Sequence, residues 1–150
     1  MYLFEHLLLG TLVSMNSQPL QPRNVEHLNS PEFVRLGLPF SAMVRVGEML
    51  YLSGQIGTLP GTLTPAPGGI QAEALQAMDN IRTSLQAHGY SMAHIIKCTV
   101  MLADMNDWAA FNTVYTRFFT PPYPARNAFA ANGLALGARL EIDVIATTRL

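Results

Sequence analysis

Hydrophobic and polar residues follow two different periods between residues 42 and 148. Short alternating runs bounded by Gly and Pro are typical of strands, whereas apolar residues three or four positions apart are typical of amphipathic helices. The alternating runs predict strands at 43–46, 49–52, 94–102, 126–132 and 139–148, and the longer period predicts helices at 70–88 and 106–119.

Turn-forming residues separate these elements. Gly47-Glu48 fits a two-residue hairpin turn, Gly89 lies where a helix C-cap is expected, and Pro121-Pro122 ends the second helix. Residues 14–41 are rich in Ser, Asn, Gln and Pro, and residues 57–69 hold many Gly and Pro. We therefore expect a lead-in without a regular element in the first of these segments and a loop in the second.

The predicted order is strand, strand, helix, strand, helix, strand, strand. Its two strand-helix-strand crossovers lay both helices on one face of a mixed sheet. We therefore expect an α+β domain over residues 38–150, preceded by an N-terminal extension and lead-in over residues 1–37. Hydrophobic residues make up 49% of the chain and charged residues only 13%, so the second sheet face is expected to meet another subunit rather than water.

Charge and metal-binding residue types exclude several functions. The net charge is -1 and no basic run occurs, which argues against nucleic acid as a partner. The single cysteine, Cys98, cannot form an internal disulfide. The histidines, which are His6, His27, His88 and His94, show no metal-ligand spacing, so no metal site is expected.

The N-terminal residues contain an apolar run, Leu7 to Val13, that is similar to the hydrophobic segment of a signal peptide. No Lys or Arg precedes it, and it is far shorter than the roughly 20 residues that span a bilayer. We therefore expect a cytoplasmic protein without a membrane partner. Export stays open if residues 1–14 act as a signal, and Met15 is an alternative start that would make those residues an extension.

Two charged residues near the last two strands attract attention. Glu141 alternates with Leu140 and Ile142, so its carboxylate should point away from the helices. Arg126 opens the preceding strand, and its guanidinium offers a rigid fork that matches a carboxylate. Alone, either residue is most often solvated or ion-paired.

Several motifs of the chain, spanning about residues 38–148, are similar to the signature of one family. They are Leu38–Gly47, Leu50–Ile56, Asp79-Asn80-Ile81, Lys97-Cys98-Thr99-Val100, Asp107-Trp108 with Phe111-Asn112 and Tyr115, Pro124-Ala125-Arg126, and Leu140-Glu141-Ile142. In this order they resemble the RidA/YjgF family. The resemblance implies a chorismate-mutase-like fold and a homotrimer whose three sheets form a central barrel, with clefts between neighbouring subunits.

The resemblance also implies hydrolysis of 2-imino acids, the unstable enamine or imine products of pyridoxal-phosphate-dependent dehydratases, to 2-oxo acids and ammonia. Arg126 would hold the substrate carboxylate, and Glu141 would deprotonate a water that attacks the imine carbon. Ser53 and Gly54 would line the pocket wall, and Asn112 would be a pocket asparagine. We expect the cation and the carboxylate to lie on neighbouring strands and to face one gap between protomers. No metal or organic cofactor is expected, because an electrophilic imine carbon mainly needs positioning.

The chain departs from the family pattern at two substrate-binding positions. Phe40 stands where many members have a tyrosine, and the missing hydroxyl favours substrates with a hydrophobic side chain or slows the reaction. Ala128 replaces a cysteine found in some members, and the reaction uses no thiol. Local readings also stay open, because Ser53 can close a strand hydrogen bond and Asn112 can bond within its helix.

Other functions of the same family are kept as alternatives. The chain can be a small-molecule-binding or chaperone-like trimer that binds an imino or oxo acid without turnover. Ribonuclease activity would require RNA binding, against which the balanced charge argues. Chorismate mutase chemistry would need several converging cations, and Arg126 is only one.

Overall fold

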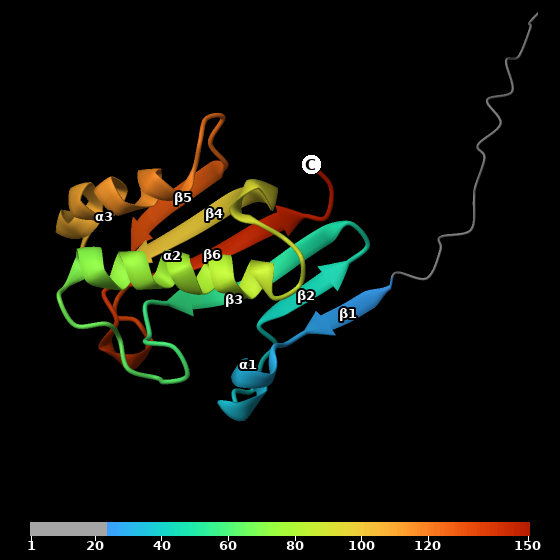
Figure 1. Cartoon of the computed structure of the whole chain (residues 1–150). Coiled ribbons are helices and arrows are strands. Elements are labelled where there is room, and N and C mark those ends of the chain that lie inside the picture. Colours follow the sequence, from blue (N-terminus) through green and yellow to red (C-terminus); the bar gives the residue numbers. More distant parts are fainter. Residues whose placement is uncertain (1–23) are drawn as a thin grey trace, which may run out of the picture.

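In the computed structural model, which describes residues 24–150, strands form one mixed sheet and the two longer helices cover one of its faces (Figure 1). The strands are β1 (Val25–Leu28), β2 (Met43–Val46), β3 (Met49–Ile56), β4 (Ile95–Leu102), β5 (Ala125–Ala130) and β6 (Leu140–Thr147). The helices are α1 (Pro31–Arg35), α2 (Ile70–Gln86) and α3 (Trp108–Tyr115), with short 3₁₀ turns at Met92–His94, Met105–Asp107, Thr116–Phe118 and Ala135–Gly137.

The strand order across the sheet is β1-β2-β3-β6-β4-β5. Strands β1, β2 and β3 form an antiparallel meander, and β6 inserts between β3 and β4, antiparallel to both. Strand β5 is the far edge and runs parallel to β4, with α3 connecting the two. The expected α+β class, with a mixed sheet and both predicted helices on one face, is confirmed (Figure 1).

The predicted turns and helix positions follow from a few residues. Gly47 has φ +60° in the hairpin turn, a conformation that glycine adopts without strain. Helix α2 buries Ala74, Met78 and other residues at helical spacing against the sheet. It ends before Gly89, which has φ +82° and is followed by a bond from the backbone N–H of Tyr90 to the carbonyl of Leu85 (3.0 Å).

The expectation that residues 14–41 hold no regular element is wrong for two short elements. Strand β1 is an exposed edge strand, so its outer residues show no apolar alternation. Helix α1 buries no residue and depends on local signals, with Ser30 as N-cap and Pro31 at its first position. The predicted helix 106–119 is also shorter, because 3₁₀ turns replace both of its ends.

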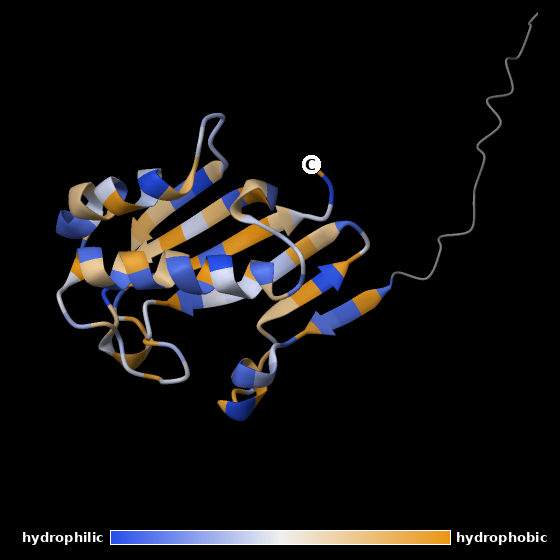
Figure 2. Ribbon diagram, in the orientation of Figure 1, coloured by the Kyte–Doolittle hydropathy of each residue, from blue (hydrophilic) through white to orange (hydrophobic). Residues whose placement is uncertain are grey.

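The core lies between the sheet and the two longer helices. Orange segments along β4 and β6 mark the hydrophobic strand residues beneath these helices (Figure 2). Full burial of a large apolar side chain contributes about 1.5–3 kcal/mol. The largest side chains that are fully buried are Met43, Leu50, Met78, Ile81, Leu85, Cys98, Val100, Leu102, Phe111, Leu140 and Ile142.

The opposite sheet face, called here the outer face, also carries apolar side chains. Val44 lies opposite Tyr51, and Tyr51 lies opposite Ile145 across successive strands. Tyr51 is 46% exposed, and Phe129 on β5 is 47% exposed. No helix among residues 24–150 covers this face, so these side chains are available to another surface.

Other expectations concern the N-terminus, membranes and metals. The interpretations of residues 1–14 lie outside the described residues. Within residues 24–150, no helix is long and apolar enough to cross a membrane. The same residues contain no group of three His, Cys, Asp or Glu side chains arranged to hold a metal ion.

Candidate active site

Arg126 lies on β5 in register with Cys98 of β4, and its side chain points toward the helices. The guanidinium carbon is 4.6 Å from the ring centroid of Tyr115, 5.4 Å from that of Trp108 and 5.9 Å from that of Phe111. All three rings belong to α3. The half-buried cation therefore rests against aromatic faces, which attract it electrostatically.

The charge of Arg126 is not neutralised within residues 24–150. None of the ion pairs formed there includes it. Burial raises the pKa of the Cys98 thiol above its ordinary value of 9.0, and burial also raises the pKa of the Tyr115 hydroxyl. Both neighbours therefore stay uncharged near neutral pH. The arrangement leaves a preorganised cation that can receive an anion.

Asn112 and Ala128 lie beside this cation. Nη1 of Arg126 donates to Oδ1 of Asn112 at 2.8 Å, so the side chain of Asn112 holds the guanidinium rather than only bonding within its own helix. Ala128 lies on the same face of β5, in register with Val100, and packs against the core. Arg126, Asn112 and Ala128, together with the three rings, form what we call the cation cluster.

Glu141 is the second residue of β6 and pairs with Ile56 on one side and Met101 on the other. Its neighbours in sequence, Leu140 and Ile142, are buried on the helix side, so Glu141 points to the outer face as predicted. A Cβ at Gly54 would overlap the Glu141 carboxylate. Glycine is therefore needed at residue 54 for the carboxylate to lie there.

Gly54 lies in an irregular part of the β3–β6 pairing, between Leu52 and Gln55. Ser53 comes just before it. The Ser53 hydroxyl donates to the carbonyl of Ser41 at 2.7 Å, so it makes the structural hydrogen bond that the sequence left open. Ser53, Gly54 and Glu141 form what we call the carboxylate cluster.

Phe40 lies on the segment between α1 and β2, just before Ser41, whose carbonyl accepts the Ser53 hydrogen bond. The Phe40 side chain is 50% exposed. Its ring meets that of Phe33 edge-on, with centroids 5.9 Å apart. Phe40 therefore presents an apolar surface supported by a second aromatic ring.

The two clusters do not meet within one chain. Arg126 faces the helix side of the sheet, whereas Glu141 faces the outer side. The expectation that their strands are neighbours is wrong, because β6 pairs with β3 and β4 while β5 pairs only with β4. Consecutive strands often pair, but here the parallel β4–β5 pair places β5 at the edge.

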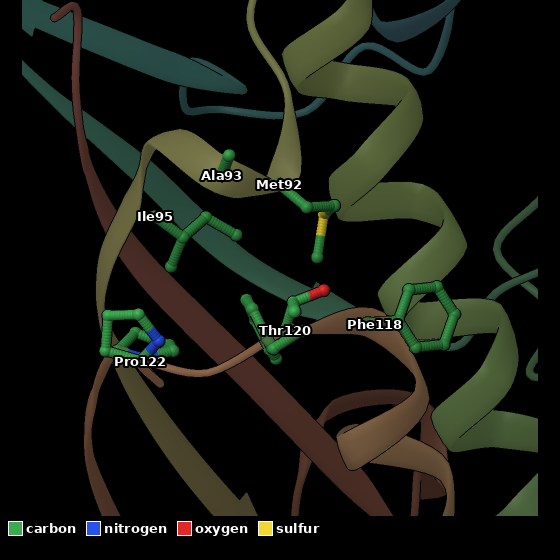
Figure 3. Close-up of a pocket in the computed structure, with 8 residues that line it drawn as sticks. Met92, Ala93, Ile95, Phe118, Thr120 and Pro122 are labelled. Atoms are coloured by element: carbon green, nitrogen blue, oxygen red, sulfur yellow. The ribbon is translucent and has the colours of Figure 1, made fainter. Parts of the chain in front are cut away.

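Two hollows of the described chain lie elsewhere. One, of about 330 Å³, is an apolar cup lined by Met92, Ile95, Phe118 and Pro122 among others (Figure 3). A second, of about 620 Å³, separates α1 from α2 and is lined mostly by polar residues. Neither is lined by a residue of the two clusters.

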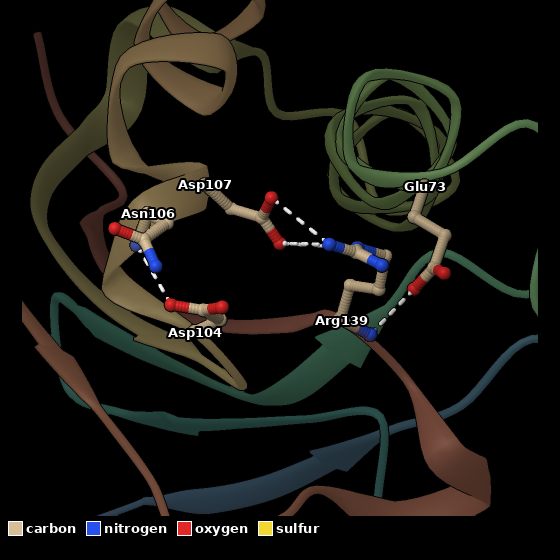
Figure 4. Close-up of polar contacts among 5 residues, drawn as sticks. All are labelled: Glu73, Asp104, Asn106, Asp107 and Arg139. Atoms are coloured by element: carbon tan, nitrogen blue, oxygen red, sulfur yellow. Dashed lines mark hydrogen bonds and ion pairs between the residues drawn. The ribbon is translucent and has the colours of Figure 1, made fainter.

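Sequence reasoning missed part of the cation cluster. It assigned Trp108 and Tyr115 to the core face of a helix, which is correct, since Tyr115 is 4% exposed. The rings of Trp108 and Tyr115 also support Arg126. Helical spacing alone does not reveal this contact, because the contact depends on how β5 packs against α3. The sequence also did not predict that Glu73, Asp107 and Arg139, which lie far apart in the chain, meet beside the start of β6 (Figure 4).

Known proteins are similar to this chain in sequence and in fold. A family model described as Endoribonuclease L-PSP matches residues 35–148. The 2-iminobutanoate/2-iminopropanoate deaminase of Capra hircus is 43% identical over 108 residues, which are 72% of this chain and 79% of that protein. RidA from the Antarctic bacterium Psychrobacter sp. PAMC 21119 matches with a TM-score of 0.70 at 31% identity, over 85% of this chain and 98% of its own. TdcF from E. coli, with bound serine, matches with a TM-score of 0.69 at 35% identity, over 73% of this chain and 88% of its own.

Proposed function

Because the chain belongs to the family described as endoribonuclease L-PSP, also called RidA/YjgF, we propose that it hydrolyses 2-imino acids to 2-oxo acids and ammonia. A relative with 43% identity carries the name of such a deaminase. A structural neighbour binds serine, a small molecule with a carboxylate next to a nitrogen-bearing carbon.

One observation carries this proposal: Arg126 is a half-buried cation without an ion-pair partner among residues 24–150, held by three aromatic rings and Asn112. Keeping a cation out of bulk water without a counter-ion is unfavourable. An arginine fork matches a planar carboxylate with two parallel hydrogen bonds. A substrate carboxylate is therefore the natural partner of this group.

In the proposed reaction, Arg126 binds the carboxylate and orients the C=N group. Glu141 takes a proton from a water whose oxygen attacks the imine carbon. Glu141 passes this proton to the nitrogen, which gives a carbinolamine. The carbinolamine hydroxyl then loses its proton to Glu141, which delivers it to the amine, and ammonia leaves as the C–N bond breaks and the carbonyl forms. Water supplies all atoms of the change, so this hydrolysis is balanced without a redox or group-transfer cofactor.

The two clusters need a second copy to act together, because they lie on opposite faces of one sheet. We place the cation cluster of one protomer against the carboxylate cluster of the next, in a closed trimer. The apolar outer face supports this arrangement, since Tyr51 and Phe129 are about half exposed there. Phe40 comes just before Ser41, whose carbonyl accepts the Ser53 hydrogen bond. In this arrangement the Phe40 ring would contact the substrate side chain.

The direct test is turnover. A threonine dehydratase generates 2-iminobutyrate in the cuvette, and the formation of 2-oxobutyrate is followed with and without the protein. We expect clear acceleration above the dehydratase alone, and an acceleration at least about 10²-fold smaller with the Glu141→Gln variant. An unchanged rate with the wild-type chain contradicts the proposed reaction.

A second test asks whether each site is shared between copies. Arg126→Met and Glu141→Gln are co-expressed so that trimers mix. With random mixing, about a quarter of the sites receive an intact cation cluster from one copy and an intact carboxylate cluster from the other. Activity near that fraction supports a shared site, whereas no recovery beyond the single variants contradicts it.

Calorimetry separates turnover from binding alone. Phe40, which lacks the hydroxyl of many relatives, is the feature that favours the binding-only alternative. If the wild-type chain binds 2-oxobutyrate and does not accelerate imine hydrolysis, the chain is a binding protein that retains the Arg126 half of the site.

A further inference from the structure

Arg139, the residue before β6, is held by three other parts of the chain. Its guanidinium meets the Asp107 carboxylate, with Nε to Oδ2 at 3.0 Å and Nη2 to Oδ1 and Oδ2 at 3.0 and 2.7 Å. Its backbone N–H donates to Oε2 of Glu73 on α2 at 2.8 Å (Figure 4). Its carbonyl accepts the N–H of Ala103 at 2.9 Å.

The burial of the two acids distinguishes this group from the surface ion pairs of the chain. Glu73 is 6% exposed, and the Asp107 side chain is 13% exposed. The Arg149–Glu48 pair, beyond the other end of β6, has exposed fractions of 78% and 55%. Carboxylates this buried are unfavourable unless they are bonded, whereas exposed pairs contribute little. We call Glu73, Asp107 and Arg139 the Arg139 clamp.

Glu73 contacts the residue that follows β3 and the residue that precedes β6, the strand that carries Glu141. Besides holding Arg139, its backbone lies so close to Gly57 that a Cβ there would overlap it. Gly57 follows Ile56, which is the β3 partner of Glu141. The first turn of α2 thus presses against the end of β3 and holds the start of β6.

The start of β6 needs such support. The segment 131–138 that leads into it includes Gly133, Leu136 and Gly137 with positive φ. Glu141 is only the second residue of the strand, and strand ends open most readily. Building on the proposed function, we propose that Glu73, Asp107 and Arg139 are positioning residues. They fix the start of β6, and therefore the Glu141 carboxylate, in the position where it meets the attacking water.

This role predicts a split between chemistry and binding. The clamp bonds the backbone at the start of the strand that carries Glu141. Arg126 is held by Asn112 and by rings of α3, of which Trp108 directly follows Asp107 of the clamp, whereas Asn112 and Tyr115 lie further along the helix. A small misplacement of a catalytic group lowers the rate of the chemical step strongly. Loss of Arg139 should therefore lower kcat and leave the affinity for a carboxylate ligand nearly unchanged.

The test compares Arg139→Met with Arg149→Met in the full chain. Arg149→Met is the matched control, because it removes an arginine ion pair beyond the opposite end of the same strand. We expect Arg139→Met to lower kcat about tenfold, with KM and the 2-oxobutyrate affinity within about twofold of wild type. Arg149→Met should change none of them. If kcat is unchanged, or if KM and affinity worsen together with it, the positioning role is wrong.

Amide hydrogen exchange gives a readout that needs no turnover. Arg139→Met should speed exchange at Leu140–Ile142 about tenfold or more and leave Ala146 unchanged. If Arg139→Met does not fold, the double variant Asp107→Asn/Arg139→Gln takes its place. This double variant removes both charges of the ion pair and so leaves no unpaired charge. Unchanged exchange at Leu140–Ile142 overturns the inference.

If the wild-type chain shows no turnover, the proposed function fails, and the exchange result still decides whether the clamp holds β6.

Discussion

The two halves of the candidate site are built in different ways. Arg126 lies on an edge strand and is held by side chains, namely three rings and one amide. Glu141 lies on a central strand and is held by backbone pairing on both sides, with a glycine beside it.

This difference determines which changes each half tolerates. A cation supported by neighbouring rings responds to the loss of those rings. A carboxylate placed by backbone register responds to added volume and to movement of the strand. Binding and chemistry should therefore be separable by substitution, and the following predictions test that separation.

Glu141→Gln should have the largest effect. The amide keeps the size of the side chain but cannot accept a proton from water, so kcat should fall by about 10²- to 10⁴-fold. The affinity for 2-oxobutyrate, measured by calorimetry, should stay within about threefold because Arg126 is untouched. A comparable loss of binding would show that the two halves are not separable.

Arg126→Lys should weaken binding first. Lysine keeps the charge and loses the planar fork and its fit against the Tyr115 and Trp108 rings. We expect the dissociation constant for 2-oxobutyrate to rise about 10- to 100-fold, the equivalent of about 1.4–2.8 kcal/mol. Retained affinity would mean that charge alone binds the ligand.

Gly54→Ala tests the space beside Glu141. The added Cβ overlaps the carboxylate, so kcat should fall about tenfold. Glu141→Asp shortens the acid by one methylene. In a double-mutant cycle that combines Gly54→Ala with Glu141→Asp, the effects of the two changes on kcat should be strongly non-additive. Simple additivity of the two changes would argue against direct contact.

The pH dependence of stability tests whether the neighbours of Arg126 stay uncharged. Burial raises the pKa of Cys98, so the folded chain keeps this proton at a pH where the unfolded chain has lost it. The free energy of unfolding should therefore fall as pH rises above about 9, by at most about 1.4 kcal/mol per pH unit for one proton. Cys98→Ala should reduce this slope in urea unfolding measured between pH 8 and 10, and an identical slope would contradict the assignment.

Tyr115 substitutions should give the smallest effect on ligand binding. Tyr115→Leu removes the ring nearest to the guanidinium, and a contribution of about 0.5–1 kcal/mol corresponds to roughly two- to fivefold weaker binding of 2-oxobutyrate. Tyr115→Phe keeps the ring and should bind like wild type. Equal losses in both variants would assign the role to the hydroxyl instead.

The sequence predicted the elements whose pattern is local. The hairpin turn at Gly47, helix α2, and the outward direction of Glu141 all follow from periods that span a few residues. Strand β1 was missed because an exposed edge strand has no buried face to reveal it. The family resemblance supplied the roles of Arg126 and Glu141, and these roles remain proposals.

The remaining features depend on packing between distant segments. Nothing near Arg126 in sequence indicates that Trp108 and Tyr115 lie against its side chain. The meeting of Glu73 with Arg139 depends on how α2 packs beside the start of β6. Single-sequence periodicity does not encode such contacts.

The position of β6 between β3 and β4 also has a consequence for how the chain folds. Its pairs with β3, such as Leu50 with Ala146, join residues that are far apart in sequence. Contacts of this kind slow folding, because a long loop closes before they form. Until β6 inserts, the β1–β3 meander and the β4–β5 pair each expose an open edge, and such edges favour aggregation. We therefore expect this chain to aggregate most readily while it refolds at high protein concentration.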